Sequence, residues 1–198
     1  PEVRIVEIDL ARIEAAAELW EAVRREGAAI DVLVNNAGIF SFRDILQTPA
    51  ERIERIILLH DLTNTQLCRM AAADMVRRGC RGHILNMSSY SLWMPFPGLA
   101  LYSASKAYLR SFSVAFAKEV REHGIRVWCN SIAPLRAPDA WDRFQYQEKI
   151  VALNEVCREL FEREFAGFFD LHALLRDSSG QLAAEYAQPD GTHWTFAA

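Results

Sequence analysis

Short runs rich in β-branched residues alternate along this chain with longer segments of helical periodicity, and this alternation most constrains the fold. The runs predict strands at residues 3–10, 31–36, 82–88 and 125–133, with a last short one at 168–171, and the longer segments predict helices at 10–26, 49–78, 103–122 and 146–164. Parallel strands need a crossover connection, which is usually a helix. We therefore expect an α/β protein, with a parallel sheet that carries helices on both faces.

Two segments allow more detailed predictions. The run at residues 31–36, Asp-Val-Leu-Val-Asn-Asn, is continuously apolar at its centre and predicts a strand buried on both faces. Thr48 and Glu51 have the spacing of a capping box, with Pro49 at the first helical position. We expect Thr48 to cap a helix that continues, with a bend, to about residue 78.

Charge and cysteine content exclude several classes of protein. The 22 Lys and Arg residues against 26 Asp and Glu leave no basic excess for nucleic acid. No apolar run approaches the roughly 18 residues that a membrane span requires, and charged residues in the first ten positions argue against a secretory signal. The four cysteines form no C-x-x-C pair, which argues against a metal site or a disulfide framework. We expect a cytoplasmic protein without metal, nucleic acid or membrane partners.

The nine glycines of the chain are scattered. None of them belongs to a G-x-G-x-x-G or G-x-x-x-x-G-K-S/T pattern. Such glycine-rich turns present backbone N–H groups to a phosphate at a helix N-terminus. The sequence therefore contains no recognisable phosphate-binding loop.

Tyr102 and Lys106, in the run Tyr-Ser-Ala-Ser-Lys, are the first candidates for chemistry. Side chains four residues apart on a helix share one face and can reach each other. An ammonium group beside a phenol stabilises the phenolate and lowers the pKa of the tyrosine from its usual value of about 10. Tyr102 is therefore a candidate proton donor and acceptor near neutral pH, with a chance pairing as the alternative.

Polar residues follow two of the predicted strands at the points where the strands end. Residues 35–38, Asn-Asn-Ala-Gly, close one strand, and residues 86–89, Asn-Met-Ser-Ser, close the next. Ligands of open α/β sheets bind at the carboxyl ends of the strands. Amide, hydroxyl and phenol groups are therefore expected to converge on one edge of the sheet.

Together these three motifs resemble the short-chain dehydrogenase/reductase family over about residues 3–134. The resemblance implies a Rossmann-like sheet, NAD or NADP as cofactor, and reversible hydride transfer between that cofactor and a small alcohol or carbonyl compound. It implies that Tyr102 is the acid/base, that Ser89 binds the substrate oxygen, and that Lys106 lowers the tyrosine pKa and contacts the nicotinamide ribose. Cofactor contacts are implied for Asp9, Asn35, Ala37, Gly38, Tyr102 and Lys106, with Asp9 beside the adenine ring and Asn35 bracing the sheet.

Two departures from the family pattern bear on activity. The family's first strand, glycine-rich turn and second strand should precede residue 3 and are not found, so we expect weakened cofactor binding and impaired activity. Asp61 stands where the family usually places an asparagine that completes a proton relay, with His60 and Asn64 nearby. An ionised aspartate only accepts hydrogen bonds, so Asp61 is a catalytic candidate with altered chemistry.

Residues 127–194 resemble the end of GDSL-type (SGNH) esterases. In that family a D-x-x-H motif supplies a histidine base and the aspartate that orients it. The histidine activates a serine nucleophile. By position, His193 would be the base and Asp190 its partner, although Asp-Gly is also a common turn. The run Asp-Ser-Ser at residues 177–179 lacks the glycine and the strand end that the nucleophile requires.

Both resemblances include the strand predicted at residues 125–133, and this overlap suggests a chimera. Residues 1–134 would form the dehydrogenase-like portion, and residues 135–198 a hydrolase-like α/β segment on the same sheet. Three functions follow: an NAD(P)-dependent oxidoreductase, which we favour, an ester hydrolase remnant that uses Asp190 and His193, and a catalytically silent scaffold.

Two further expectations concern what the protein binds. Trp93 and Phe96 lie between the candidate serine and tyrosine in the sequence and favour an apolar or aromatic carbonyl substrate. By resemblance, the helix predicted at residues 103–122 is a candidate face for a homo-oligomer.

Overall fold

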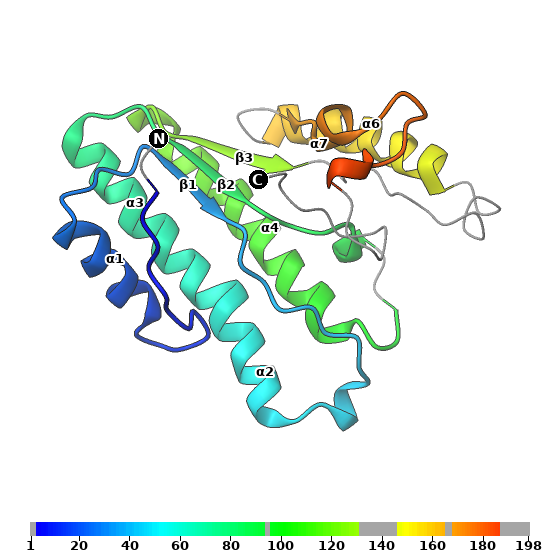
Figure 1. Cartoon of the computed structure of the whole chain (residues 1–198), viewed down its shortest axis with the longest axis horizontal. Coiled ribbons are helices and arrows are strands. Elements are labelled where there is room, and N and C mark those ends of the chain that lie inside the picture. The colour runs from blue at the N-terminus through cyan, green and yellow to red at the C-terminus, as the bar shows by residue number, and fades with distance from the viewer. Residues whose placement is uncertain (1–2, 94–95, 131–145, 165–167, 187–198) are drawn as a thin grey trace. The chain divides into compact units, whose positions relative to one another are not determined.

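The structure, a computed structural model, describes residues 3–93, 96–130, 146–164 and 168–186 (Figure 1). It divides into two compact units, Pro1–Trp128 and Cys129–Ala198. The first unit contains α1 (Ala15–Arg25), β1 (Val32–Asn35), α2 (Ala50–Ile57), η2 (Leu58–Thr63), α3 (Asn64–Arg78), β2 (His83–Asn86), α4 (Ala100–Val120) and the start of β3 (Arg126–Asn130). The second unit contains α6 (Tyr146–Glu164), β4 (Phe168–Phe169) and α7 (Leu171–Leu175). The boundary predicted at residue 134 lies outside the described residues.

The strands pair in parallel, as predicted for an α/β protein. β1 and β2 run side by side, with Asn35 opposite Asn86 at their carboxyl ends. β3 begins beside the start of β2, where the Arg126 N–H donates to the Gly82 carbonyl at 2.9 Å. In the second unit, the last two residues of β3 pair in parallel with β4.

The strand predicted at residues 3–10 is wrong. No described residue pairs with this segment in a sheet, and several of its apolar side chains remain in solvent. Val3 and Ile5 are 80% and 90% exposed. The segment ends in a turn in which the Ala11 N–H donates to Asp9 Oδ1 at 3.0 Å, and α1 therefore begins only at residue 15.

Helices α3 and α4 lie side by side against one face of β1 and β2 (Figure 1). Ile84 on that face is fully buried, together with Met75 of α3 and Leu109 of α4. The other face of β1 carries Val32 and Val34, which are 58% and 52% exposed. The prediction that this strand is buried on both faces is therefore wrong: alternate side chains point to opposite faces, and the described helices of the first unit cover only one.

One helical segment runs from residue 50 to residue 78, as predicted, and it changes geometry halfway. The π-helical turn η2 interrupts it between α2 and α3. Thr63 in this turn donates to the Leu10 carbonyl at 2.9 Å. The capping prediction is wrong, because the helix begins after Pro49 with no side-chain cap and the Thr48 hydroxyl donates to the Asp44 carbonyl instead. π-Turns inside α-helices occur frequently at functional sites.

The second unit contains the predicted long helix, α6, and the short strand β4 within the predicted range. Asp170 caps α7: its Oδ1 accepts from the Ala173 N–H at 2.9 Å, and its Oδ2 accepts from Arg158 Nη2 at 2.5 Å. These two bonds hold the pKa of Asp170 below its ordinary value, although burial opposes them. Among the described helices, none is both long and apolar enough to cross a membrane.

Candidate active site

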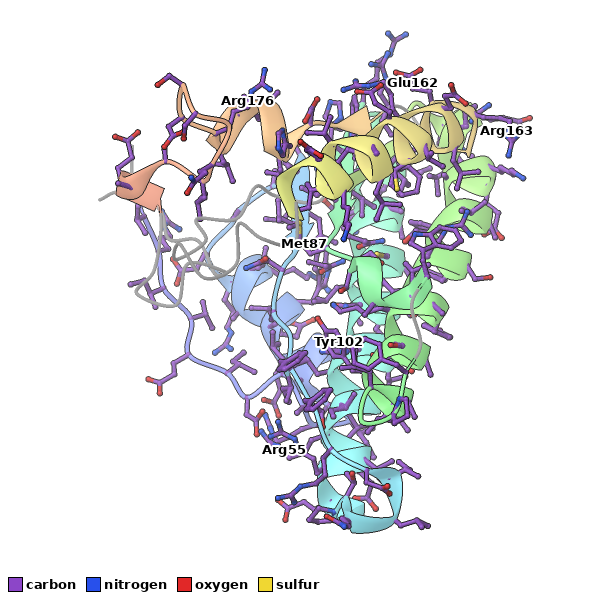
Figure 2. All side chains as sticks on the ribbon, turned by 90° about the vertical axis from the view of Figure 1, so that its right-hand side faces the viewer. Arg55, Met87, Tyr102, Glu162, Arg163 and Arg176 are labelled. Atoms are coloured by element: carbon purple, nitrogen blue, oxygen red, sulfur yellow. The ribbon has the colours of Figure 1, made fainter. Side chains whose placement is uncertain are left out.

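The first turns of α4 present Tyr102 and Lys106 on one helix face, as their spacing predicts. The Lys106 ammonium lies 5.7 Å from the centre of the Tyr102 ring. Figure 2 shows Tyr102 on the first unit between Met87, which follows β2, and Arg55 of α2. The phenol and the ammonium are therefore brought together near the carboxyl end of β2.

Lys106 is almost fully buried, with 5% of its surface exposed. Its Nζ donates to the Met87 carbonyl at 3.0 Å. Burial disfavours the charged form and lowers the pKa of Lys106 to about 8, although the nearby Asp61 carboxylate acts in the opposite direction. The lysine is therefore fixed in place, and its charge is available near neutral pH.

Asp61 lies in the π-turn η2 and is partly buried. Its Oδ1 is buried and accepts no hydrogen bond within the described part of the chain. Burial raises the pKa of Asp61 to about 6, and the charge of Lys106 opposes this rise. Asp61 is therefore a partly buried carboxyl group that changes protonation close to neutral pH.

His60, the preceding residue of the same turn, is fully buried. Its Nδ1 lies 2.8 Å from Ser105 Oγ, and its Nε2 accepts from the Ile39 N–H at 2.8 Å. Its ring meets the Tyr102 ring edge to face, with 5.8 Å between centroids. Burial, assisted by the charge of Lys106, lowers the pKa of His60 to about 4. His60 is therefore neutral near pH 7, and both ring nitrogens are engaged.

The loop after β1 passes close to these groups. Residues 36–38 are exposed. A Cβ added at Gly38 would lie 3.3 Å from His60 Nε2 and 3.8 Å from Lys106 Nζ. A side chain at this position would crowd the histidine, so glycine lets the backbone approach the pair of buried bases.

Asn35 joins the strand ends to the helices behind them. Its Nδ2 donates to Asn86 Oδ1 at 2.8 Å, and Asn86 Nδ2 donates to Ser113 Oγ at 2.8 Å. Cys68 of α3 also contacts both amides, and burial raises the pKa of its thiol to about 12. This buried network joins the two strand ends to α3 and α4.

Ser89 and Asp9 have different surroundings. Ser89 follows Met87 by two residues, and its Oγ accepts from the Ser91 N–H at 3.2 Å, which leaves its own hydrogen free to be donated elsewhere. Asp9 forms a two-pronged ion pair with Arg55, at 3.0 and 3.3 Å. The Arg55 bonds, with the Ala11 N–H, lower the pKa of Asp9. Its carboxylate is thus already engaged within the protein.

Exposed aromatic side chains follow the first strand end, one of them against Tyr102, and sequence reasoning missed Phe40 and Phe42. Phe40 meets the Tyr102 ring edge to face at 5.1 Å and is 59% exposed. Phe42 packs against Phe96, with 6.1 Å between ring centroids. The signal for Phe40 and Phe42 was their alternate spacing directly after the Asn-Asn-Ala-Gly run, which places both on one side of an extended segment.

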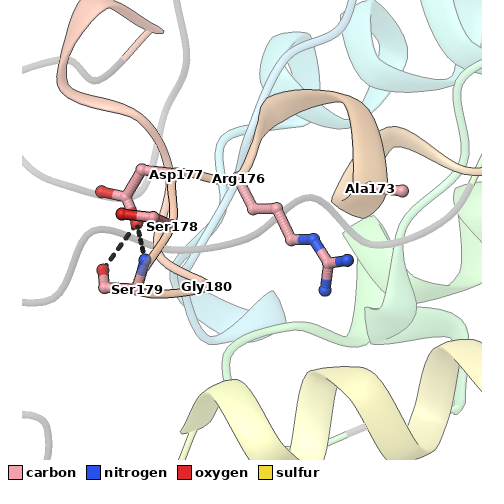
Figure 3. A pocket seen from close by; sticks show the side chains of 6 residues that line it. All are labelled: Ala173, Arg176, Asp177, Ser178, Ser179 and Gly180. Atoms are coloured by element: carbon pink, nitrogen blue, oxygen red, sulfur yellow. Dashed lines mark hydrogen bonds between the residues drawn. The ribbon is translucent and has the colours of Figure 1, made fainter.

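A separate tight turn lies in the second unit, where a pocket of about 630 Å³ is lined by residues 173 and 176–180 (Figure 3). Asp177 Oδ1 accepts from the Ser179 N–H at 2.9 Å and from the Ser179 hydroxyl at 2.6 Å. This carboxylate therefore closes its own turn. Asp190 and His193, the candidate hydrolase pair, lie outside the described residues.

Within the described part of the chain, the residues around Tyr102 fit the nicotinamide-ribose end of a nicotinamide cofactor. Lys106, Tyr102 and the exposed loop at residues 36–38 can hold the nicotinamide ribose beside the phenol, because the close approach at Gly38 leaves backbone uncovered there. For the pyrophosphate, the sequence offers no glycine-rich turn. The described residues also contain no group of three or more side chains that could ligate a metal ion.

Comparison with known proteins finds reductases among the relatives of this chain. Carbonyl reductase (NADPH) 2 of Sus scrofa is 32% identical over 147 residues, which cover 73% of this chain and 57% of the relative. A very-long-chain 3-oxoacyl-CoA reductase of Pyricularia oryzae is 38% identical over 103 residues, or 51% of this chain and 31% of the relative. The chain thus spans less than two thirds of the length of these curated relatives.

Solved structures agree in fold. A metagenomic short-chain oxidoreductase in complex with NADP superposes with a TM-score of 0.60 at 30% identity, covering 67% of this chain and 62% of that one. A 4-hydroxyisoleucine dehydrogenase complexed with NADH and succinate reaches a TM-score of 0.68 at 22% identity, over 85% and 77% of the two chains. These likenesses confirm the predicted Rossmann-like α/β fold.

The family model described as short chain dehydrogenase matches residues 1–144. This match includes the strand predicted at residues 125–133, which the esterase resemblance also claimed. The match extends over most of the sequence and over all the residues gathered around Tyr102, and the chain therefore belongs to the short chain dehydrogenase family.

Proposed function

We propose that the protein is an NAD(P)-dependent oxidoreductase that interconverts an alcohol and a ketone or aldehyde. The proximity of the Lys106 ammonium to the Tyr102 ring, 5.7 Å from its centre, carries this proposal. When bound, the nicotinamide supplies or accepts the hydride. Tyr102 donates a proton to the carbonyl oxygen during reduction and takes it from the hydroxyl during oxidation.

Lys106 and Ser89 support this proton transfer. The ammonium, held by the Met87 carbonyl, favours the phenolate that remains after Tyr102 has given up its proton. Ser89 donates its hydroxyl hydrogen to the substrate oxygen, because its Oγ already accepts the Ser91 N–H. Asp61, which follows His60 in the π-turn, would exchange protons with Lys106.

The aromatic residues around Tyr102 favour an apolar or aromatic carbonyl substrate. The exposed Phe40 lies against the phenol, and the loops of Phe42 and Phe96 are tied together where the Arg43 N–H donates to the Gly98 carbonyl at 2.8 Å. Exposed aromatic rings that gather next to a reacting group offer an apolar surface for a ligand.

The loop after β1 and Asp9 are the proposed cofactor contacts outside the Tyr102–Lys106 pair. Backbone at Ala37 and Gly38 would contact the ribose, and Asn35 would hold that loop through its network with Asn86. If Asp9 contacts the adenine, its carboxylate must bind the adenine and Arg55 at the same time. We expect a cytoplasmic protein that self-associates through α4.

A pair of tyrosine variants tests the assignment. Tyr102→Phe removes the proton donor, whereas Tyr108→Phe removes a hydroxyl on the same helix that lies 3.0 Å from Thr65 Oγ1. With NADH and NADPH and a panel of aromatic and aliphatic ketones, we expect Tyr102→Phe to lose about 100-fold or more in rate, the usual worth of general acid catalysis, and Tyr108→Phe to lose little. Equal activity of both variants would refute the role of Tyr102.

A further inference from the structure

His60 is a fully buried histidine that the proposed proton transfer does not use. It lies in the π-turn and is fully buried, yet both of its ring nitrogens have partners. A buried polar group with two well-placed partners is expensive to disturb, because each partner would be left unsatisfied. Loss of the His60 side chain would therefore leave both of these partners without their hydrogen bond.

The partners of His60 fix its protonation state. Nε2 lies 2.8 Å from the Ile39 backbone nitrogen, which can only donate, so Nε2 carries no hydrogen. Nδ1 then carries the hydrogen and donates it to Ser105 Oγ at 2.8 Å. Ser105 passes its own hydrogen to the Tyr102 carbonyl at 2.8 Å, which completes a consistent chain of donors.

Both ends of this series of hydrogen bonds are backbone groups of the site. One end is the amide that follows Gly38, in the exposed loop after β1, and the other is the carbonyl of Tyr102 itself. Neither end can take up or release a proton near neutral pH, so the chain does not conduct protons. Its effect is mechanical, since it joins the loop at residues 37–39 to the first turn of α4.

We propose that His60 is a positioning residue that holds the loop at residues 37–39 at a fixed distance from Tyr102 and Lys106, so that the nicotinamide ribose meets a preformed surface. This inference rests on the proposed function. The close approach of Gly38 to His60 Nε2, 3.3 Å for an added Cβ, shows how tightly the two segments are joined. Within the helical segment itself, Asn64 donates to the His60 backbone carbonyl at 3.0 Å.

The charges that face His60 keep it in the required neutral state. Lys106 is the cation nearby, and burial together with that charge lowers the pKa of the imidazole to about 4. Tyr102 faces the ring edge to face, and Asp61 adjoins it in the chain with a pKa raised to about 6. The join should therefore remain intact throughout the neutral range.

Three variants of the full-length chain separate positioning from mere packing. His60→Gln keeps one acceptor and one donor at the end of its side chain, whereas His60→Leu is apolar and keeps neither. Thr63→Val, in the same π-turn, removes the buried hydrogen bond from Thr63 to the Leu10 carbonyl and serves as the matched control. All three are compared with the wild type in amide hydrogen exchange and in NADH and NADPH titrations, and turnover is assayed with an aromatic ketone.

We expect the Ile39 amide to exchange about five- to tenfold faster in His60→Leu, the equivalent of one neutral hydrogen bond, and to be unchanged in Thr63→Val. The cofactor dissociation constant should rise by a similar factor in His60→Leu and recover in His60→Gln. Exchange or affinity that changes equally in His60→Leu and Thr63→Val would overturn the proposal, since it would show a general loss of packing.

Nitrogen NMR of the imidazole provides a readout that does not depend on activity. The proposal predicts a protonated Nδ1, an unprotonated Nε2 and no titration between about pH 5 and pH 8. The opposite tautomer, or titration near the ordinary pKa, would overturn it. If the wild type binds no cofactor but His60 shows the predicted tautomer and protects Ile39, the proposed function fails and the structural join stands.

Discussion

Asp61→Asn tests the electrostatics of the site through the pH dependence of stability. The native carboxyl group has a pKa raised from 3.8 to about 6 by burial. Between these two values the native state holds a proton that the unfolded state has already lost. By linkage, this group makes the native state less stable as pH rises through the window from about 4 to about 6.

The size of the effect follows from the pKa difference. A rise from 3.8 to about 6 is worth about 3 kcal/mol. Solvent reaches part of the side chain, so we reduce the expected value to about 2 kcal/mol. Asparagine cannot titrate, and the free energy of unfolding of the variant should therefore lack this contribution. The stability difference between the two proteins should shift by about 2 kcal/mol in favour of Asp61→Asn between about pH 4 and about pH 7.

The assay is urea unfolding at several pH values, followed by circular dichroism, with the slope against urea checked for each protein. The test is how the difference in unfolding free energy between Asp61→Asn and the wild type changes with pH. Its value at a single pH is not informative, because any packing change contributes equally at all pH values. A difference that is constant over this range, or one that shifts toward the wild type, would refute the reasoning about Asp61.

Three further perturbations follow from the described contacts. Asn86→Leu should cost about 3 kcal/mol in urea unfolding, because Asn35 Nδ2 and Ser113 Oγ each lose a buried partner; a cost under about 1 kcal/mol would contradict the network. Gly38→Ala should cost about 1 kcal/mol and speed exchange of the Ile39 amide, because the new Cβ meets His60 Nε2 at 3.3 Å; unchanged exchange would show that the loop moves freely. Lys106→Met should stabilise the protein by about 1 kcal/mol at neutral pH while it abolishes turnover, because burial disfavours the ammonium. The wild type gains stability as pH rises from about 8 to 10.5, so the advantage of Lys106→Met should shrink over that range in pH-dependent unfolding; an advantage that grows would contradict the lowered pKa of Lys106.

Local patterns predicted much of this structure. The four-residue spacing of Tyr102 and Lys106 placed them on one helix face, and the helix at residues 146–164 has the predicted bounds. Both predictions depend only on periodicity along the chain. The parallel pairing of β1 with β2 followed from the alternation of strands and helices.

Features that depend on distant partners were not predictable. The role of His60 arises from Ile39 and Ser105, which are 21 and 45 residues away. Residues 3–10 have the composition of a strand, but no described strand pairs with them. The exposure of Val32 and Val34 likewise depends on which face the helices cover, and the apolar run alone could not indicate this.

The most direct test of the central claim follows the hydrogen atoms of the reaction. The wild-type chain is incubated with an aromatic ketone and with NADH or NADPH that carries deuterium at the transferable position, and the product is analysed by mass spectrometry and NMR. The account predicts an alcohol with deuterium on its carbinol carbon and with an oxygen-bound hydrogen from solvent. An unlabelled carbinol carbon, or no alcohol from either cofactor while Tyr102→Phe behaves like the wild type, would contradict hydride transfer at this site.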